Sequence, residues 1–220
     1  MKYVSFYADI DGDDYYSHHA QRISRELDNF GLEHYIVNKG SGGNYQGNCL
    51  SKPDFMVEMF DRLREPFVWL DIDTFMLKYP SGFDELLEMP VDIGFASSSG
   101  TMAGMKASPV FVNNTPAAYD FLKSWKWYAN ANAEADKPYF DHELLFKLIP
   151  RTEGKLEIGY LHGGYCLWPE GTPLVSALEN HTYNDEVLRI GFSGSESKCE
   201  GLKKLGSTAE AIAIQTIEKR

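Results

Sequence analysis

The sequence has few cysteines and no long apolar run. Cys49, Cys166 and Cys199 stand far apart and form no CxxC pair, so neither a cysteine-based zinc motif nor a redox dithiol is expected. No window approaches the roughly 18 apolar residues of a membrane span, and the first ten residues lack the apolar stretch of a signal peptide. These absences predict a cytoplasmic protein without a membrane span.

Positive charge is also scarce. The chain has 21 Lys and Arg against 32 Asp and Glu, which gives a formal net charge of −11. Such a surface repels phosphate backbones, so nucleic acid is not an expected partner. An anionic small molecule meets the same repulsion, and binding it requires a metal ion or a local cluster of lysines.

The chain is rich enough in apolar residues to form one compact domain, with 43% apolar residues among 220. Apolar runs and helical periodicities alternate along it, which predicts an α/β fold. We expect a single Rossmann-like domain whose central, mostly parallel sheet is flanked by helices. Expected strands are 3–8, 34–37, 67–70, 91–96, 110–112, 156–161 and 188–190; expected helices are 15–30, 52–64, 116–129, 141–148 and 208–218.

Glycine and proline mark the boundaries of this pattern. The segment 40–48 holds four glycines in nine residues, a composition typical of a loop. Pro53 stands where the first turn of a helix tolerates proline. We assign residues 1–190 to the main domain and 191–220 to a flexible segment rich in Gly, Ser and Lys with a C-terminal helix, packed on the same domain.

Two carboxylates follow the third expected strand. Residues 67–70 (FVWL) are continuously apolar, which is typical of a strand buried on both faces, and Asp71 and Asp73 come directly after it. Two hard oxygen donors suit Mg²⁺ or Mn²⁺, which also binds diphosphates. The alternative for Asp71 is an ordinary strand-end residue that caps a loop.

These segments in order resemble the GT-A glycosyltransferases, the metal-dependent enzymes that use nucleotide sugars. The resemblance rests on the helix from Lys52, the apolar strand with its DxD motif at 67–74, and the segments 92–96, 109–114 and 141–145. It covers roughly residues 1–190 and implies a GT-A fold.

The resemblance implies transfer of a sugar, most commonly from a uridine diphosphate (UDP) sugar, to a hydroxyl of a glycan or other acceptor. It also implies Mn²⁺ or Mg²⁺ as cofactor, with Asp73 as the principal ligand. The metal ligands would be Asp71, Asp73 and His181. The residues assigned to the donor and its metal are Tyr7, Ala8, Asp9, Lys52, Asp71, Ile72 and Asp73.

Three side chains are candidates for the chemistry itself. Lys52, at the expected start of its helix, would add to the charge stabilisation of the departing diphosphate; an ordinary solvent-exposed lysine is the alternative. Asp141, expected at the cap of its helix, would act on the acceptor side. If the reaction inverts the anomeric configuration, Asp141 or Glu143 is the base; if it retains it, Asp141 stabilises the oxocarbenium-like transition state. Simple helix capping is the alternative for Asp141.

Two other functions compete with this interpretation. A phosphoryl-transfer enzyme of the haloacid dehalogenase type also has two aspartates after a buried strand, with Asp71 as the nucleophile. Phe75 stands where that pattern has a small Thr or Val. A binding module that recognises sugar nucleotides without catalysis is the third class.

Overall fold

The computed structural model describes residues 1–9, 14–40, 45–74, 76, 79–97, 99–135, 138–152 and 154–166. The expected strand 188–190, the helix 208–218 and the segment 191–220 lie outside these residues. Among the described residues, none of the helices has the length and apolarity needed to cross a bilayer.

A six-stranded sheet forms the centre of the fold, in the order β2-β1-β3-β5-β4-β6. The pairs β1–β2, β1–β3 and β4–β6 are parallel, and β5 is antiparallel to both neighbours. The expectation of a mostly parallel sheet is therefore confirmed. The strands are β1 (Lys2–Tyr7), β2 (His34–Asn38), β3 (Phe67–Trp69), β4 (Ile93–Ser97), β5 (Met105–Val112) and β6 (Ile158–Leu161).

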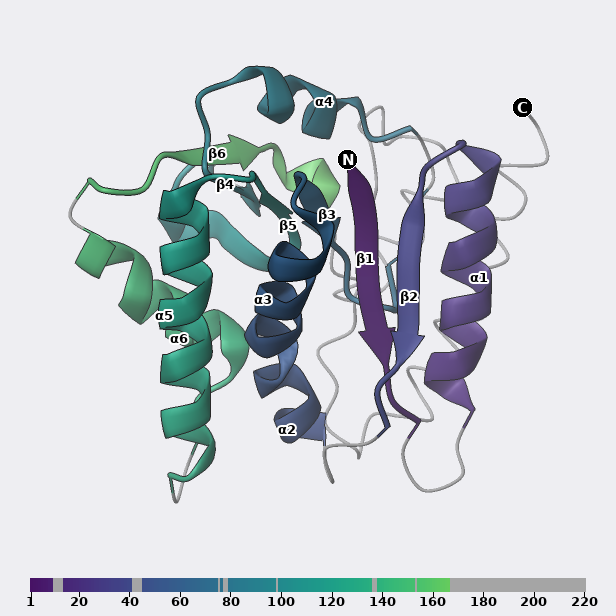
Figure 1. The fold of residues 1–220 in the computed structure, drawn as a ribbon, viewed down its shortest axis with the longest axis horizontal. Coiled ribbons are helices and arrows are strands. Elements are labelled where there is room, and N and C mark those ends of the chain that lie inside the picture. Colours follow the sequence, from purple (N-terminus) through teal and green to yellow (C-terminus); the bar gives the residue numbers. More distant parts are fainter. Residues whose placement is uncertain are drawn as a thin grey trace.

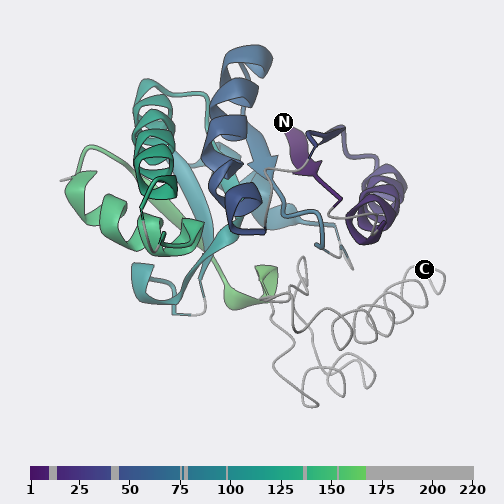
Figure 2. The same cartoon turned by 90° about the horizontal axis from the view of Figure 1, so that it is seen from below.

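Helices cover both faces of this sheet (Figures 1 and 2). Helices α3, α5 and α6 pack together over one face, and α3 and α5 lie side by side in both views. Helices α1 and α4 pack against the other face. The helices are α1 (Tyr15–Asn29), α2 (Tyr45–Leu50), α3 (Lys52–Leu63), α4 (Ser81–Glu88), α5 (Pro116–Ala133) and α6 (Asp141–Leu148), with short 3₁₀ turns η1 (Met102–Gly104), η2 (Ile149–Thr152) and η3 (Gly163–Tyr165).

Strand β3 shows how the sequence builds the two cores. Successive side chains of a strand point to opposite faces. Phe67 and Trp69 accordingly belong to the core under α3 and α5, whereas Val68 and Leu70 belong to the core under α1 and α4. All four are at most 2% exposed. This confirms a strand buried on both faces and explains its continuous apolarity.

Two predictions of local structure are wrong. The expected loop 40–48 overlaps helix α2, which includes Gly47. Tertiary contacts outweigh the low helix propensity of glycine here, because Gln46 Nε2 donates to the carbonyl of Pro138 (2.6 Å) and Leu50 is buried. Helix α4 was not expected at all, since a helix of two turns leaves only a short periodic pattern.

Helix α4 packs where two neighbouring strands lack side chains. Gly94 on β4 and Gly159 on β6 are register partners. A Cβ added at Gly159 would lie 2.6 Å from Leu86 Cδ2, and one at Gly94 would also collide with Leu86. The paired glycines therefore create the space that receives Leu86 of α4.

Candidate functional site

The parallel strands end at one edge of the sheet, where the predicted donor-binding segments meet. Strands β1 and β3 are adjacent and parallel, so residues 7–9 and 71–73 follow two paired strands. Helix α3 ends shortly before β3 begins, and its first residue contacts a residue that lies just after the strand. Its N-terminal residue Lys52 therefore lies at the same edge as Asp71.

The DxD segment leaves the sheet as a turn. Residues 72 and 73 form a turn closed by the Thr74 N–H, which donates to the Asp71 carbonyl (3.0 Å). Ile72 is 6% exposed and packs in the core under α1 and α4. Asp71 and Asp73 are both partly exposed. The buried side chain between them thus anchors a segment that presents two carboxylates near the surface.

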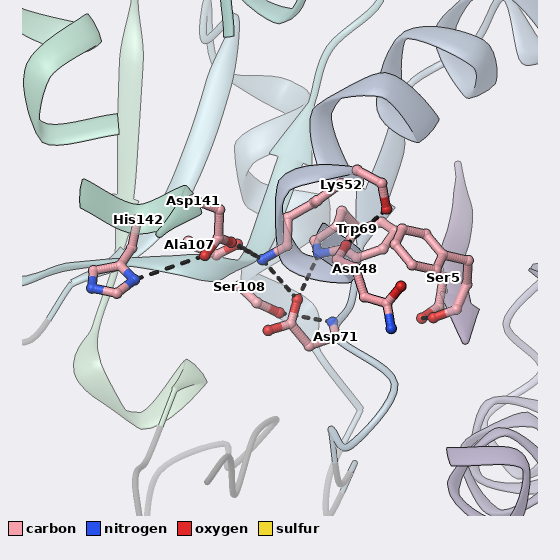
Figure 3. A network of polar contacts seen from close by, with 11 residues as sticks. Ser5, Asn48, Lys52, Trp69, Asp71, Ala107, Ser108, Asp141 and His142 are labelled. Carbon is pink, nitrogen blue, oxygen red and sulfur yellow. Dashed lines mark hydrogen bonds and ion pairs between the residues drawn. The ribbon is translucent and has the colours of Figure 1, made fainter. Parts of the chain in front are cut away.

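Lys52 joins two acidic residues that are far apart in the sequence (Figure 3). Its Nζ lies 3.0 Å from Asp71 Oδ1 and donates to Asp141 Oδ2 and to the Ala107 carbonyl (3.3 Å). The side chain of Lys52 is only 6% exposed. The helix start at Lys52 is confirmed, and its ammonium group is used to hold Asp71 and Asp141 together.

The electrostatics of this cluster favour the charged forms of Lys52 and Asp141. Burial by itself lowers the pKa of Lys52, but the carboxylates of Asp141 and Asp71 outweigh it and raise that pKa above its ordinary value. Burial alone raises the pKa of Asp141; the attraction of Lys52, with a contribution from His142, holds it well below its usual range. Asp141 is therefore a carboxylate of low basicity.

The predicted cap position of Asp141 is wrong. Helix α6 begins at Asp141, and its N-cap residue is Phe140, which has no side-chain acceptor. The cap hydrogen bond comes instead from Glu143, whose Oε2 accepts from the Phe140 N–H (2.7 Å). Asp141 turns inward to Lys52, because pairing with a buried ammonium satisfies its charge where water does not reach it.

Residues 7–9 begin with the last residue of strand β1 and lead away from the sheet. Tyr7 is partly buried, and Ala8 is 4% exposed. Asp9 Oδ1 accepts from the Ser17 N–H (2.9 Å), so this carboxylate binds the first turn of α1. These residues lie at the same edge as the DxD turn; the predicted third metal ligand, His181, lies outside the described residues.

The sequence analysis missed two partners of Asp71. Trp69 Nε1 donates to Asp71 Oδ1 (2.8 Å), and Ser108 Oγ accepts from the Asp71 N–H (2.9 Å). Trp69 precedes Asp71 by two residues, so strand periodicity places them on one face and offers a local signal. Ser108 comes from β5, 37 residues away, and has no local signal.

The donor set at this edge fits a divalent cation of the Mg²⁺ or Mn²⁺ type. Such ions are commonly bound by one or two carboxylates and complete their coordination with water and substrate phosphates. Asp71 and Asp73 are two such carboxylates. Within the described part of the chain, no cluster of three or more metal-ligating side chains occurs, so phosphate and water oxygens would supply the remaining ligands.

Comparison with solved structures relates this fold to known proteins. The chain is similar to a glycosyltransferase involved in glycosylation of the major capsid of PBCV-1, with a TM-score of 0.62 and 13% identity over 100% of this chain and 98% of that one. It also matches mouse xyloside xylosyltransferase 1 (TM-score 0.45, 11% identity, 90% of this chain and 99% of that one). A third match is the galactosyltransferase LgtC (TM-score 0.44, 11% identity, 84% and 80% coverage).

The likeness to the PBCV-1 capsid glycosyltransferase establishes the fold. The chain has a GT-A fold, with a six-stranded central sheet flanked by helices, as the sequence analysis expected. No protein-family model and no curated protein sequence matches the chain. The haloacid dehalogenase alternative receives no support from the likeness to the PBCV-1 capsid glycosyltransferase.

Proposed function

We propose that this protein is a glycosyltransferase that moves a sugar from a nucleoside diphosphate sugar, with UDP as the expected nucleotide, to an acceptor hydroxyl. One observation carries the proposal. Asp71 and Asp73 follow the central strand β3, beside the end of β1, in a chain that shares its fold over its whole length with a glycosyltransferase. Ligands of open α/β sheets bind beyond the carboxyl ends of the strands.

The proposed donor site uses Asp71 and Asp73 to hold Mg²⁺ or Mn²⁺. When bound, the ion would offset the negative charge that develops on the leaving diphosphate, an electrostatic contribution of the kind that dominates many enzymes. The protein has a net charge of −11 and therefore repels an anionic donor. The positive charge of the bound ion would reduce this repulsion at the site. Residues 7–9, at the neighbouring strand end, are the proposed contacts of the base and ribose.

Lys52 is proposed as a positioning residue. Its ammonium group is buried against Asp71 and Asp141 and therefore orients these carboxylates. Trp69 adds a second hydrogen bond to the same oxygen of Asp71. Together they hold the Asp71 carboxylate in one orientation, which reduces the reorganisation needed when the donor binds.

Asp141 is better suited to an electrostatic role than to proton abstraction. A base whose pKa is far below the working pH holds a proton weakly, and Lys52 lowers the pKa of Asp141. A fixed negative charge instead stabilises a positively charged, oxocarbenium-like transition state. Glu143, two residues further along α6, is partly exposed and is the proposed base if the reaction inverts.

Calorimetry of UDP binding tests the donor site. We expect binding in the presence of Mn²⁺, and loss of most of the affinity in chelator or in Asp73→Asn. Asp120→Asn is the matched control, because Asp120 is an exposed carboxylate on α5. Hydrolysis of the UDP-sugar by the wild type distinguishes an enzyme from a binding module. UDP affinity unaffected by both the chelator and Asp73→Asn would refute the proposed site.

A further inference from the structure

Helix α1 buries three polar side chains that the proposed chemistry does not use. His19 and Arg22 are each 2% exposed and Glu26 is 4% exposed. Arg22 Nη1 donates to Glu26 Oε1 (2.7 Å), and His19 Nδ1 lies 3.0 Å from Arg22 Nη2 and accepts from Arg22 Nε (3.3 Å). These contacts fix the guanidinium group in one orientation.

The buried pair extends from α1 to the backbone that follows the DxD turn. Arg22 Nη2 donates to the Thr74 carbonyl (2.7 Å), and Glu26 Oε2 accepts from the Met76 N–H (2.9 Å). Thr74 and Met76 are fully buried. One ion pair therefore holds two backbone groups immediately after Asp73, across about 50 residues of sequence.

The same helix is bound to the other proposed donor segment. Asp9 Oδ1 accepts from the Ser17 N–H in the first turn of α1. Ser17 and Arg22 are little more than one turn apart on this helix. Helix α1 thus connects the segment after β1 with the segment after β3, the two strand ends proposed to bind the nucleotide and its diphosphate.

A buried ion pair of this kind is weak evidence for a stabilising role. Removing two charges from water costs free energy that an apolar pair of similar size avoids, so replacement by apolar residues is often neutral or stabilising. Unlike an apolar pair, the ion pair makes directional hydrogen bonds to the Thr74 carbonyl and the Met76 N–H.

We propose that Arg22 and Glu26 are positioning residues that fix the backbone after Asp73 and so hold the Asp73 carboxylate in place for the donor diphosphate. This inference rests on the proposed function and adds to it the means by which the turn is held. Neither residue touches the donor; both act through the backbone of Thr74 and Met76.

Arg22→Lys tests the inference. Lysine keeps the positive charge, but its single ammonium group cannot replace the planar guanidinium group that contacts Glu26, His19 and the Thr74 carbonyl together. Arg25→Lys is the matched control at an exposed position of the same helix. We expect hydrogen exchange over residues 71–76 to accelerate at least tenfold in Arg22→Lys. We also expect the UDP affinity of Arg22→Lys to fall at least tenfold when Mn²⁺ is present. The UDP affinity measured with a metal chelator should stay unchanged. Arg25→Lys should behave as the wild type.

Glu26→Gln gives a second measurement that does not depend on the folding of Arg22→Lys. Glutamine keeps the size of the side chain and an oxygen acceptor for the Met76 N–H, but loses the charge that holds Arg22. If Glu26→Gln folds and keeps both the hydrogen-exchange rates of the wild type over residues 71–76 and its UDP affinity, the inference is overturned, even if the Tm of the variant is lower. The proposed function would not be affected by that result. A wild type without Mn²⁺-dependent UDP binding would instead refute the proposed function, and the inference with it.

Discussion

Lys52 Nζ lies 3.0 Å from Asp71 Oδ1 in a site where the lysine side chain is only 6% exposed. Lys52→Met removes the ammonium group and keeps most of the side-chain volume. We expect the variant to lose about 3–5 kcal/mol of the free energy of unfolding, because Asp141 is left as a buried carboxylate without its lysine partner. Urea unfolding measures this loss, and calorimetry should show weaker Mn²⁺-dependent UDP binding.

The double variant Lys52→Met/Asp141→Asn separates stability from function. Removing the second charge should recover part of the lost free energy of unfolding, since no unpaired carboxylate remains at position 141. It should not restore UDP binding, because Asp71 still lacks its lysine. A double variant no more stable than Lys52→Met would contradict the pairing of Lys52 with Asp141.

Trp69→Phe tests the orientation of Asp71. The change removes the indole N–H that donates to Asp71 Oδ1 (2.8 Å) and leaves an aromatic ring against Phe55 and Phe6. A hydrogen bond to a charged group contributes about 1.5–3 kcal/mol, so we expect Mn²⁺-dependent UDP affinity to fall about tenfold. Trp127→Phe is the matched control, because Trp127 is 64% exposed. Equal UDP affinities of the two variants would show that the indole N–H does not position Asp71.

The strand before the DxD segment was predictable because its signals are local. Continuous apolarity over residues 67–70 predicts a doubly buried strand, and the acidic residues directly after it predict where it ends. Partners that lie far apart in the sequence give no such signal. Asp141 is 89 residues from Lys52, and its inward orientation depends on where α6 packs. A capping role was the simplest local interpretation, and it was wrong.

Helix α1 shows a second limit of sequence patterns. Its apolar positions Ile23 and Leu27 are in the core, as the helical spacing predicts. Arg22 and Glu26 form an i,i+4 charged pair, which is typical of a solvent-exposed helix face. The pair is buried because the backbone after Asp73 packs over it, and that backbone belongs to a segment 50 residues away. Local periodicity cannot report such a contact.

The paired glycines under α4 give a stability prediction. Gly159→Ala places a methyl group 2.6 Å from Leu86 Cδ2 and 3.0 Å from Val91 Cγ1, so we expect a loss of about 1–3 kcal/mol in the free energy of unfolding. In a Leu86→Ala background the same substitution should cost clearly less, since the nearest colliding methyl group, Leu86 Cδ2, is gone. Urea unfolding of the wild type, Gly159→Ala, Leu86→Ala and the double variant measures the coupling energy between positions 159 and 86. An equal cost in both backgrounds would show that Leu86 does not occupy this space.

His19 makes stability depend on pH. Burial, together with the neighbouring Arg22 and His18, lowers the pKa of His19 to about 3 in the folded protein, whereas an unfolded histidine titrates near 6.5. Between about pH 6.5 and 3 the unfolded state therefore binds more protons than the folded state, and the folded protein loses stability as the pH falls.

The loss due to His19 approaches about 1.4 kcal/mol per pH unit below the unfolded pKa. His19→Asn keeps a side-chain acceptor for Arg22 but removes the titration, so its unfolding free energy should fall less steeply than that of the wild type between pH 7 and 5. Urea unfolding at half-unit intervals measures both slopes. His18→Asn, which removes the exposed neighbouring histidine of the same helix, is the control and should keep the steeper dependence. Parallel curves for the wild type and His19→Asn would mean that His19 takes up protons as readily in the folded protein as in the unfolded chain, in conflict with its burial against Arg22.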